Sequence, residues 1–231
     1  MGRNDAAILW RMLRGMPGGG SEQERLDRFY RPQAAGYDAF RERLLQGRRE
    51  LIELLAIPPG ARVVELGAGT GRNLKFFGER LRQLARVDVV DLCPSLLEQA
   101  RRRCRKWPNV CVVEADATTW RPEQPADVVY FSYTLTMIPQ WRRAVDNALA
   151  MLAPGGKLGV VDFYVSPSRH GLLARQFWPL WFAHDGVRLD AAHLPYVSGA
   201  TSEIMRREAL APLPYLPGLR APYYLYVGRK A

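Results

Sequence analysis

A glycine-rich loop constrains this chain more than any other feature of its sequence. Residues 67–71 read Gly-Ala-Gly-Thr-Gly, and they come directly after the apolar run Arg62–Leu66 and before a helical pattern over residues 72–82. Glycine permits the positive φ angles of a sharp turn and lets the backbone approach a ligand closely. The loop therefore predicts a strand, a tight turn and a helix, with a ligand held at the turn.

Short apolar runs alternate with helical stretches over residues 61–165, which is typical of a parallel sheet with helices on both faces. Beyond residue 165 the alternation stops, and two later runs predict one antiparallel strand pair. The chain is thus predicted to form a seven-stranded, mostly parallel α/β sheet. The further strands are expected at Val87–Asp91, Val110–Glu114, Asp127–Ser132, Leu158–Val165, Ile204–Leu210 and Tyr223–Val227, and the main helices at Pro94–Arg105 and Trp141–Leu152.

The length of 231 residues suits one large α/β domain. We expect that domain to occupy residues 21–231. Within it, residues 21–60 are predicted to form a helical lid, residues 61–165 a ligand-binding core, and residues 166–231 a segment on the side of the second substrate.

Residues 1–20 are expected to form an amphipathic helix followed by a glycine-rich joint. The helix either lies on a membrane surface or packs on the body of the domain, and the sequence leaves both open. The first alternative predicts that deleting residues 1–17 weakens binding to anionic vesicles. Leu9, Met12, Leu13 and Met16 would share one face of this helix, and Arg3, Arg11 and Arg14 the opposite face.

Charge and cysteine content narrow the choice of partner and compartment. The chain has 33 basic and 23 acidic residues, a formal net charge of +10, which favours nucleic acid, acidic lipid surfaces or anionic substrates. Cys93, Cys104 and Cys111 form no CxxC pair, so neither a disulfide framework nor a metal site is expected. No apolar run approaches the roughly 20 residues that span a bilayer. These features predict a cytoplasmic protein.

The glycine spacing separates this loop from two common phosphate-binding loops. A dinucleotide-binding loop that begins at Gly67 would need glycine at position 72, where the chain has Arg72, and no Gly-Lys-Ser/Thr follows. Asp91 ends the second predicted strand, twenty positions after Gly71, where an acid can accept both hydroxyls of a ribose. Asp116 follows the third strand, where a carboxylate can bind an adenine amino group.

Taken in order, these signals over residues 61–165 resemble the class I S-adenosyl-L-methionine-dependent methyltransferases. The resemblance implies a Rossmann-like fold, S-adenosyl-L-methionine as cofactor and S-adenosyl-L-homocysteine as product. The residues that it assigns to the cofactor are Tyr30, Tyr37, Arg48, Glu65, Gly67, Ala68, Gly69, Thr70, Gly71, Asn73, Asp91, Leu92, Asp116, Ala117 and Ser132.

The segments outside that core resemble a narrower family, the betaine-lipid N-methyltransferases of the BtaB type. The resemblance is carried by Phe29-Tyr30, residues 34–48, residues 131–139, residues 177–182 and the Pro-Tyr-Tyr stretch near the C-terminus. It implies trimethylation of the amine of diacylglyceryl-homoserine to diacylglyceryl-trimethylhomoserine, at the inner face of a membrane. The enzyme that makes diacylglyceryl-homoserine is then a candidate partner, and nucleic acid is not.

Three rival readings remain. The nearest is a phosphatidylethanolamine N-methyltransferase or another small-molecule methyltransferase. The net charge alone suggests an RNA methyltransferase, although no RNA-binding module is appended. A binding protein without activity is the third, and the intact loop with Asp91 argues against it.

Methyl transfer to an amine is an in-line displacement that needs a neutral nitrogen, close alignment and exclusion of water. The cationic product suits an aromatic lining. Tyr30, Tyr37 and Tyr133 are the candidate catalytic residues, and Tyr133 is preferred because it directly follows the fourth strand. Other aromatic candidates are Trp178, Trp181, Tyr223 and Tyr224; His170, His184 and His193 are candidate bases; and Arg48, Arg175, Arg220 and Arg229 are candidates for a head-group carboxylate.

Overall fold

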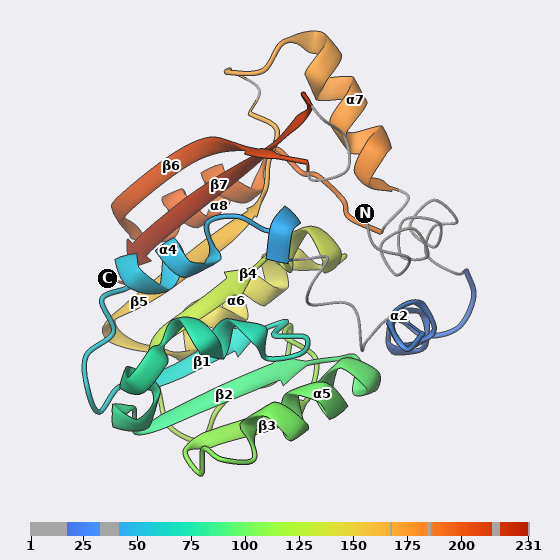
Figure 1. The fold of residues 1–231 in the computed structure, drawn as a ribbon. Helices are drawn as coiled ribbons and strands as arrows, with labels where there is room; N and C mark the ends of the chain where they lie inside the picture. Colours follow the sequence, from blue (N-terminus) through green and yellow to red (C-terminus); the bar gives the residue numbers. More distant parts are fainter. Residues whose placement is uncertain (1–17, 33–41, 167, 184–185, 214–217, 231) are drawn as a thin grey trace.

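A seven-stranded sheet crosses the molecule in the order β3-β2-β1-β4-β5-β7-β6 (Figure 1). The computed structural model describes residues 18–32, 42–166, 168–183, 186–213 and 218–230. Strands β1 to β5 run parallel to one another, whereas β7 runs antiparallel to both β5 and β6. The predicted seven-stranded, mostly parallel sheet is therefore confirmed. The strands are β1 (Arg62–Leu66), β2 (Arg86–Asp91), β3 (Val110–Glu114), β4 (Ala126–Ser132), β5 (Leu152–Phe163), β6 (Ser202–Pro212) and β7 (Arg220–Arg229).

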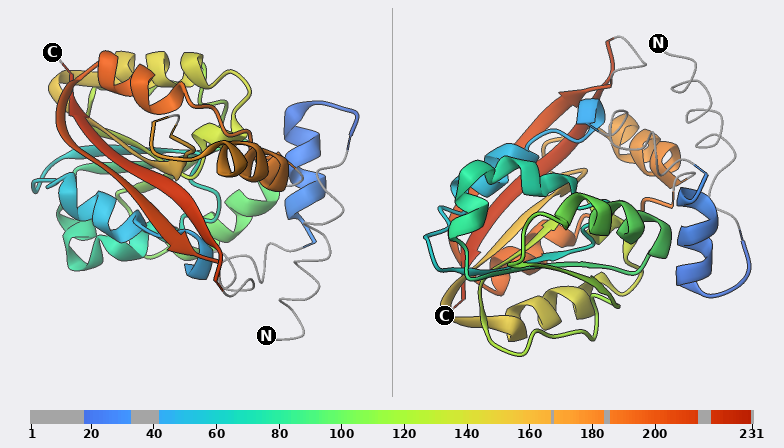
Figure 2. Two further views of the ribbon diagram at one scale, coloured as in Figure 1. Left: turned by 90° about the horizontal axis from the view of Figure 1, so that it is seen from above. Right: turned by 60° about the horizontal axis from the view of Figure 1, so that its bottom comes forward.

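Helices cover both faces of this sheet, because successive strand residues point to opposite sides and are apolar on both. Val63 and Val87 pack in one core with the helices α4 and α5, and Val64 and Val90 pack in the other with α6 and α8. The first view of Figure 2 shows the sheet between these two helical layers. The helices are α2 (Glu22–Tyr30), α4 (Arg48–Leu54), α5 (Pro94–Cys104), α6 (Trp141–Met151), α7 (Leu172–Ala183) and α8 (His193–Gly199).

Two segments differ from the sequence-based expectation. Residues 72–82 form two short 3-10 helices, η1 (Arg72–Phe76) and η2 (Gly78–Gln83), rather than one α-helix. Gly78 has a φ angle of +57°, which an α-helix does not allow, so the helical path breaks there. The region after residue 165 contains α7 and α8, which the aromatic-rich and proline-containing sequence did not predict.

The start of α2 follows from a local hydrogen-bond exchange. Ser21 Oγ accepts from the backbone N–H of Glu24 at 3.2 Å, and Glu24 Oε2 accepts from the N–H of Ser21 at 2.8 Å. This capping box satisfies two N–H groups that a helix start leaves unpaired. Residues 1–17, which include the predicted N-terminal helix, lie outside the described part of the chain. Tyr37 and His184 lie outside it too. Among the helices that the structure does describe, none is both long and apolar enough to cross a bilayer.

Candidate active site

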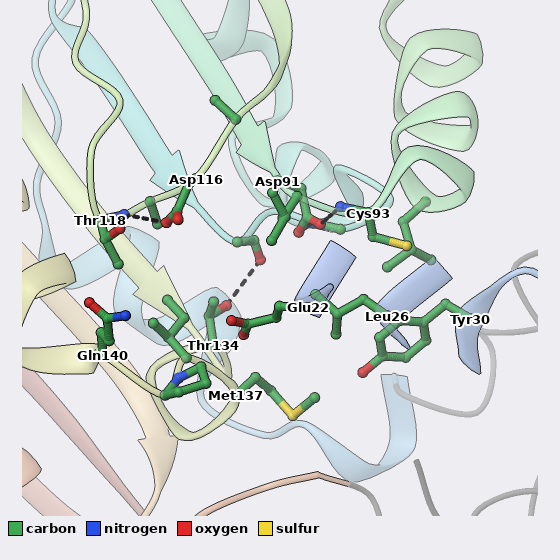
Figure 3. Close-up of a pocket in the computed structure, with 18 of the residues that line it drawn as sticks. Glu22, Leu26, Tyr30, Asp91, Cys93, Asp116, Thr118, Thr134, Met137 and Gln140 are labelled. Atoms are coloured by element: carbon green, nitrogen blue, oxygen red, sulfur yellow. Dashed lines mark hydrogen bonds between the residues drawn. The ribbon is translucent and has the colours of Figure 1, made fainter. Parts of the chain in front are cut away.

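A cavity opens at the carboxyl ends of the parallel strands, where the sequence places its glycine loop and strand-end acids (Figure 3). It encloses an empty volume of about 850 Å³, part of it open to solvent, which is within the range of small-molecule sites. Four loops that follow β1 to β4 contribute to it, and α2 closes one side. The predicted site residues that line it are Tyr30, Gly67, Gly69, Asp91, Leu92, Asp116, Ala117 and Tyr133.

A second, smaller cavity adjoins the first. Gly67, Gly69 and Tyr133 line both cavities, so the two meet at these residues. Almost every residue that lines the smaller cavity was predicted from the sequence as well. The predicted residues that line it are Arg48, Glu65, Gly67, Ala68, Gly69, Thr70, Asn73, Ser132 and Tyr133. Of the predicted cofactor residues that the structure describes, the two cavities bring together all except Gly71, which faces Ala100.

Asp91 joins the end of β2 to the glycine loop. Its Oδ2 accepts from the backbone N–H of Gly69 at 2.7 Å, and its Oδ1 accepts from the N–H of Cys93 at 2.8 Å. Burial raises the pKa of Asp91, while these backbone hydrogen bonds act in the opposite direction. Each carboxylate oxygen has a further lone pair, and Asp91 lines the larger cavity. It can therefore hold the loop and accept hydrogen bonds from a ligand at once.

The glycines of the loop serve different purposes. A Cβ at Gly67 would lie 1.9 Å from Cγ2 of Thr134, and Thr134 Oγ1 donates to the Gly67 carbonyl at 3.0 Å. Gly67 thus permits close packing between the β1 and β4 loops. A Cβ at Gly69 would have as its nearest neighbour Leu96 Cδ1 at 3.7 Å, so Gly69 leaves open space in the cavity. Both have positive φ angles, +72° and +56°.

Asp116 enters the larger cavity from the loop after β3. Its Oδ1 accepts from the backbone N–H of Thr118 at 2.7 Å, which fixes the carboxylate (Figure 3). Asp91 lines the same cavity from the end of β2, and the two acids therefore present acceptors to one ligand from adjacent strands.

A buried polar network forms the floor of the smaller cavity. Glu65 accepts from Asn73 Nδ2 at 2.6 Å and from the Tyr130 hydroxyl at 2.8 Å, and Arg48 Nη1 donates to Asn73 Oδ1 at 3.3 Å. Burial raises the pKa of Glu65 to about 7, although the hydrogen bonds from Tyr130 and Asn73 and the charge of Arg48 lower it. Glu65 is thus close to its protonation midpoint at neutral pH in the free protein.

This pKa predicts a pH-dependent stability. The pKa of Glu65 is about 7 in the folded protein and 4.5 for an ordinary glutamate, so the folded state holds this proton more tightly than the unfolded state does. The free energy of unfolding therefore falls as the pH rises from 4.5 towards 7. Replacing Glu65 by Gln keeps an oxygen acceptor and removes the ionisation. Urea unfolding at pH 5 and pH 7.5 should show the free energy of unfolding of the wild type falling by about 2 kcal/mol more than that of Glu65→Gln over this interval. Parallel pH profiles for the two proteins would contradict it.

One face of α2 forms a wall of the larger cavity, opposite the ends of the strands. Glu22, Leu26 and Tyr30 are spaced four residues apart and all line it (Figure 3). Asp27 fixes the helix, because its Oδ1 accepts from the backbone N–H of Ser95 at 3.2 Å. Burial raises the pKa of Glu22. Tyr30 was predicted from the sequence, whereas Glu22 and Leu26 were not, although a helix that starts after Ser21 places all three on one face.

Tyr133 stands where the two cavities meet, in a constrained conformation. Its φ angle is +58°, in the left-handed region that favours glycine. Its N–H donates to the carbonyl of Val161 at 2.7 Å, its hydroxyl donates to the carbonyl of Gln46 at 2.7 Å, and its ring packs edge-on against Phe163. Backbone, hydroxyl and ring are therefore all fixed, and the residue is held at the junction of the two cavities.

The described candidate bases, His170 and His193, lie outside both cavities. His193 is fully buried edge-on against Trp141, and burial lowers its pKa to about 4. His170 Nδ1 accepts from the N–H of Ser166 at 3.0 Å. Trp178 and Tyr224 belong to the two hydrophobic cores. Neither cavity is lined by His170, His193, Trp178, Trp181, Tyr223, Tyr224, Arg175, Arg220 or Arg229. Across the described ranges, no three His, Cys, Asp or Glu side chains are grouped as metal ligands.

Sequence comparison relates the core of the chain to known enzymes. Residues 63–156 match a family model described as "Methyltransferase domain". Trans-aconitate 2-methyltransferase of Methylobacterium nodulans is 31% identical over 144 residues, which is 62% of this chain and 54% of that protein. The ubiquinone/menaquinone biosynthesis C-methyltransferase UbiE of Hydrogenovibrio crunogenus is 30% identical over 135 residues, 56% of this chain and 52% of that protein. The chain thus spans about half the length of the curated relatives it matches.

Solved structures share the fold over most of the chain. The N-methyltransferase NodS of Bradyrhizobium japonicum WM9, in complex with S-adenosyl-L-homocysteine, matches with a TM-score of 0.67 and 19% identity, covering 91% of this chain and 99% of NodS. Phosphoethanolamine N-methyltransferase 2 of Haemonchus contortus, in complex with S-adenosyl-L-methionine, matches with a TM-score of 0.71 and 15% identity, covering 92% of this chain and 60% of that one. Identities this low establish a common fold and leave the acceptor open.

Proposed function

We propose that this chain, whose residues 63–156 match a methyltransferase domain, is a class I S-adenosylmethionine-dependent methyltransferase that acts on the amine of a lipid head group. The proposal rests on two cavities that meet at Tyr133. The larger cavity is lined by strand-end acids, and the smaller one is polar. S-adenosylmethionine has an adenosine part and an amino-acid part on either side of its sulfonium. The two cavities offer a separate compartment to each part.

The residues present fit that cofactor. Asp91 and Asp116 offer acceptors for the ribose hydroxyls and the adenine amino group. In the smaller cavity, Ser132 Oγ is buried and has no hydrogen-bond partner among the described residues. A buried hydroxyl without a partner is costly, and a polar ligand there would satisfy it. Arg48 and Glu65 line the same cavity, and they offer a guanidinium and a carboxyl group to the carboxylate and ammonium of an amino acid.

The residues of the chain then align the acceptor. When bound, S-adenosylmethionine supplies an electrophilic methyl group, and the new N–C bond forms as the S–C bond breaks. Tyr133 orients the amine from the junction of the cavities, because its ring and hydroxyl are fixed. The helix α2 excludes water by covering the larger cavity with Leu26 and Tyr30. The amine must arrive neutral, and the ammonium product must release a proton before each further transfer.

The choice of acceptor rests on the resemblance of the flanking segments to betaine-lipid N-methyltransferases. Under this proposal the substrate is diacylglyceryl-homoserine, the product is diacylglyceryl-trimethylhomoserine, and the chain acts at the cytoplasmic face of a membrane. The fold shared with NodS and with phosphoethanolamine N-methyltransferase 2 is compatible with transfer to nitrogen. The similarity to trans-aconitate 2-methyltransferase favours a second candidate, methylation of a small carboxylic acid.

The test is an assay with labelled S-adenosylmethionine and three separate acceptors, followed by mass analysis. We expect diacylglyceryl-homoserine to gain up to three methyl groups, and phosphatidylethanolamine and trans-aconitate to gain none.

Tyr133→Phe should lower kcat about two- to tenfold, because it removes one positioning hydrogen bond, and should leave S-adenosylhomocysteine affinity nearly unchanged.

The matched control for that variant is Tyr226→Phe. It removes the hydroxyl that shares a hydrogen bond with Thr201 at 2.7 Å. Tyr226 is on β7 and lines neither cavity. Its kcat should equal that of the wild type. Methylation of trans-aconitate in place of the lipid would replace the first candidate by the second.

A further inference from the structure

The helix α7 exposes an apolar face to solvent. Leu172, Leu173, Phe177 and Leu180 are 73%, 86%, 39% and 72% exposed, and their spacing places them on one side of the helix. Figure 1 shows α7 projecting from the end of the molecule beyond the β6–β7 hairpin. Large apolar side chains grouped in this way mark a surface that binds something. We call these four residues the α7 face.

The opposite side of α7 is anchored in the protein. Trp178 and Phe182 are buried and stack on one another, and Phe182 packs on Phe163 with 4.4 Å between ring centroids. Phe163 in turn contacts Tyr133, the residue at the junction of the two cavities. The α7 face is therefore presented by a helix that three ring contacts connect to the candidate active site.

The charged side chains within the segment that carries α7 have a single sign. Residues 163–184 contain no Asp or Glu, and they include Arg169 and Arg175, both exposed. Arg169 lies 3.7 Å from Glu208, yet its side chain remains 66% exposed. An apolar helix face flanked by exposed arginines is complementary to a bilayer that contains anionic lipids.

We propose that α7 docks the protein on an anionic lipid surface by inserting the α7 face between the lipid head groups. A second copy of the chain is a poorer occupant. A standard protein interface uses roughly 20 to 30 residues on each side, and the α7 face has four on one helix of 12 residues. This docking does not depend on which acceptor is methylated, because it concerns the binding of the protein to a surface.

The test is co-sedimentation of the full chain with phosphatidylcholine vesicles, with and without phosphatidylglycerol. We expect the wild type to bind the anionic vesicles more tightly. The double variant Leu173→Gln, Leu180→Gln should bind them at least about tenfold more weakly, because two exposed leucines are lost from the inserting face. Both side chains point to solvent, so circular dichroism should show an unchanged fold; Leu172→Gln is a second, single variant of the same face.

The matched control is Ile204→Gln, Leu210→Gln. These residues on β6 are 48% and 49% exposed, so the variant removes two half-exposed apolar side chains from another element. It should bind vesicles as the wild type does. The proposal is overturned if the wild type does not bind anionic vesicles, if the α7 variants bind like the wild type, or if both double variants weaken equally. A wild-type dimer that the α7 variants convert to a monomer would also overturn it, in favour of a second copy as the occupant.

Discussion

Replacing Asp91 by alanine is expected to weaken the binding of S-adenosylhomocysteine at least about a hundredfold. A charged carboxylate that accepts two ribose hydrogen bonds contributes about 3 kcal/mol or more. The same substitution removes the acceptor for the Gly69 N–H, so the loop also loses one of its constraints. Isothermal titration calorimetry with S-adenosylhomocysteine measures the loss, and thermal unfolding without ligand should show that the domain still folds.

Replacing Gly69 by valine should abolish binding for a different reason. The side chain would enter the open space that both cavities share, which the ligand is expected to occupy. Gly69→Ala, with a smaller side chain in the same place, should bind with an intermediate affinity. If Gly69→Val and Asp91→Ala both bound S-adenosylhomocysteine as the wild type does, the assignment of the cofactor to these cavities would be wrong.

Replacing Gly67 by alanine should lower the free energy of unfolding by roughly 3 kcal/mol, since the added methyl group collides with Thr134 and the φ angle is positive. For a chain of this size that corresponds to a fall in Tm of about 10 °C. Differential scanning calorimetry of the protein without ligand measures it.

Gly69→Ala is the matched control, because it has the same strained φ angle without the collision. It should cost only about 1 kcal/mol, or roughly 3 °C in Tm. A smaller loss for Gly67→Ala than for Gly69→Ala would show that close packing against Thr134 is not the reason for glycine at position 67.

The sequence predicted the parallel core well because its signals are local. A buried parallel strand is a short apolar run, and the turn after β1 needs glycine at its positive φ angles. The same local reasoning failed at α7 and α8, where prolines at 179 and 195 and many aromatic residues obscure the helical period. It also failed at η1 and η2, where the break depends on the backbone angle of Gly78.

The part of the candidate site that could be predicted from the sequence is the part formed by motifs at the ends of neighbouring strands. Asp91, Asp116 and the glycine loop were found because strand ends of a parallel sheet meet at one edge. Glu22 and Leu26 were missed because their place in the cavity depends on how α2 docks against α5, which is a tertiary contact. The hydrogen bond from Tyr133 to Gln46 was missed for the same reason, since 87 residues separate the partners.

The outer strand β6 bears on how the protein behaves at high concentration. An edge strand offers unpaired N–H and C=O groups to any other exposed strand, and flat apolar edges therefore aggregate. β6 instead carries Glu203, Arg206, Arg207 and Glu208, and Arg207 forms an ion pair with Glu50. Another molecule that tried to extend the sheet at β6 would have to bury these charges. Self-association through the sheet edge is disfavoured, which leaves the protein free to present its other surfaces even when it is abundant.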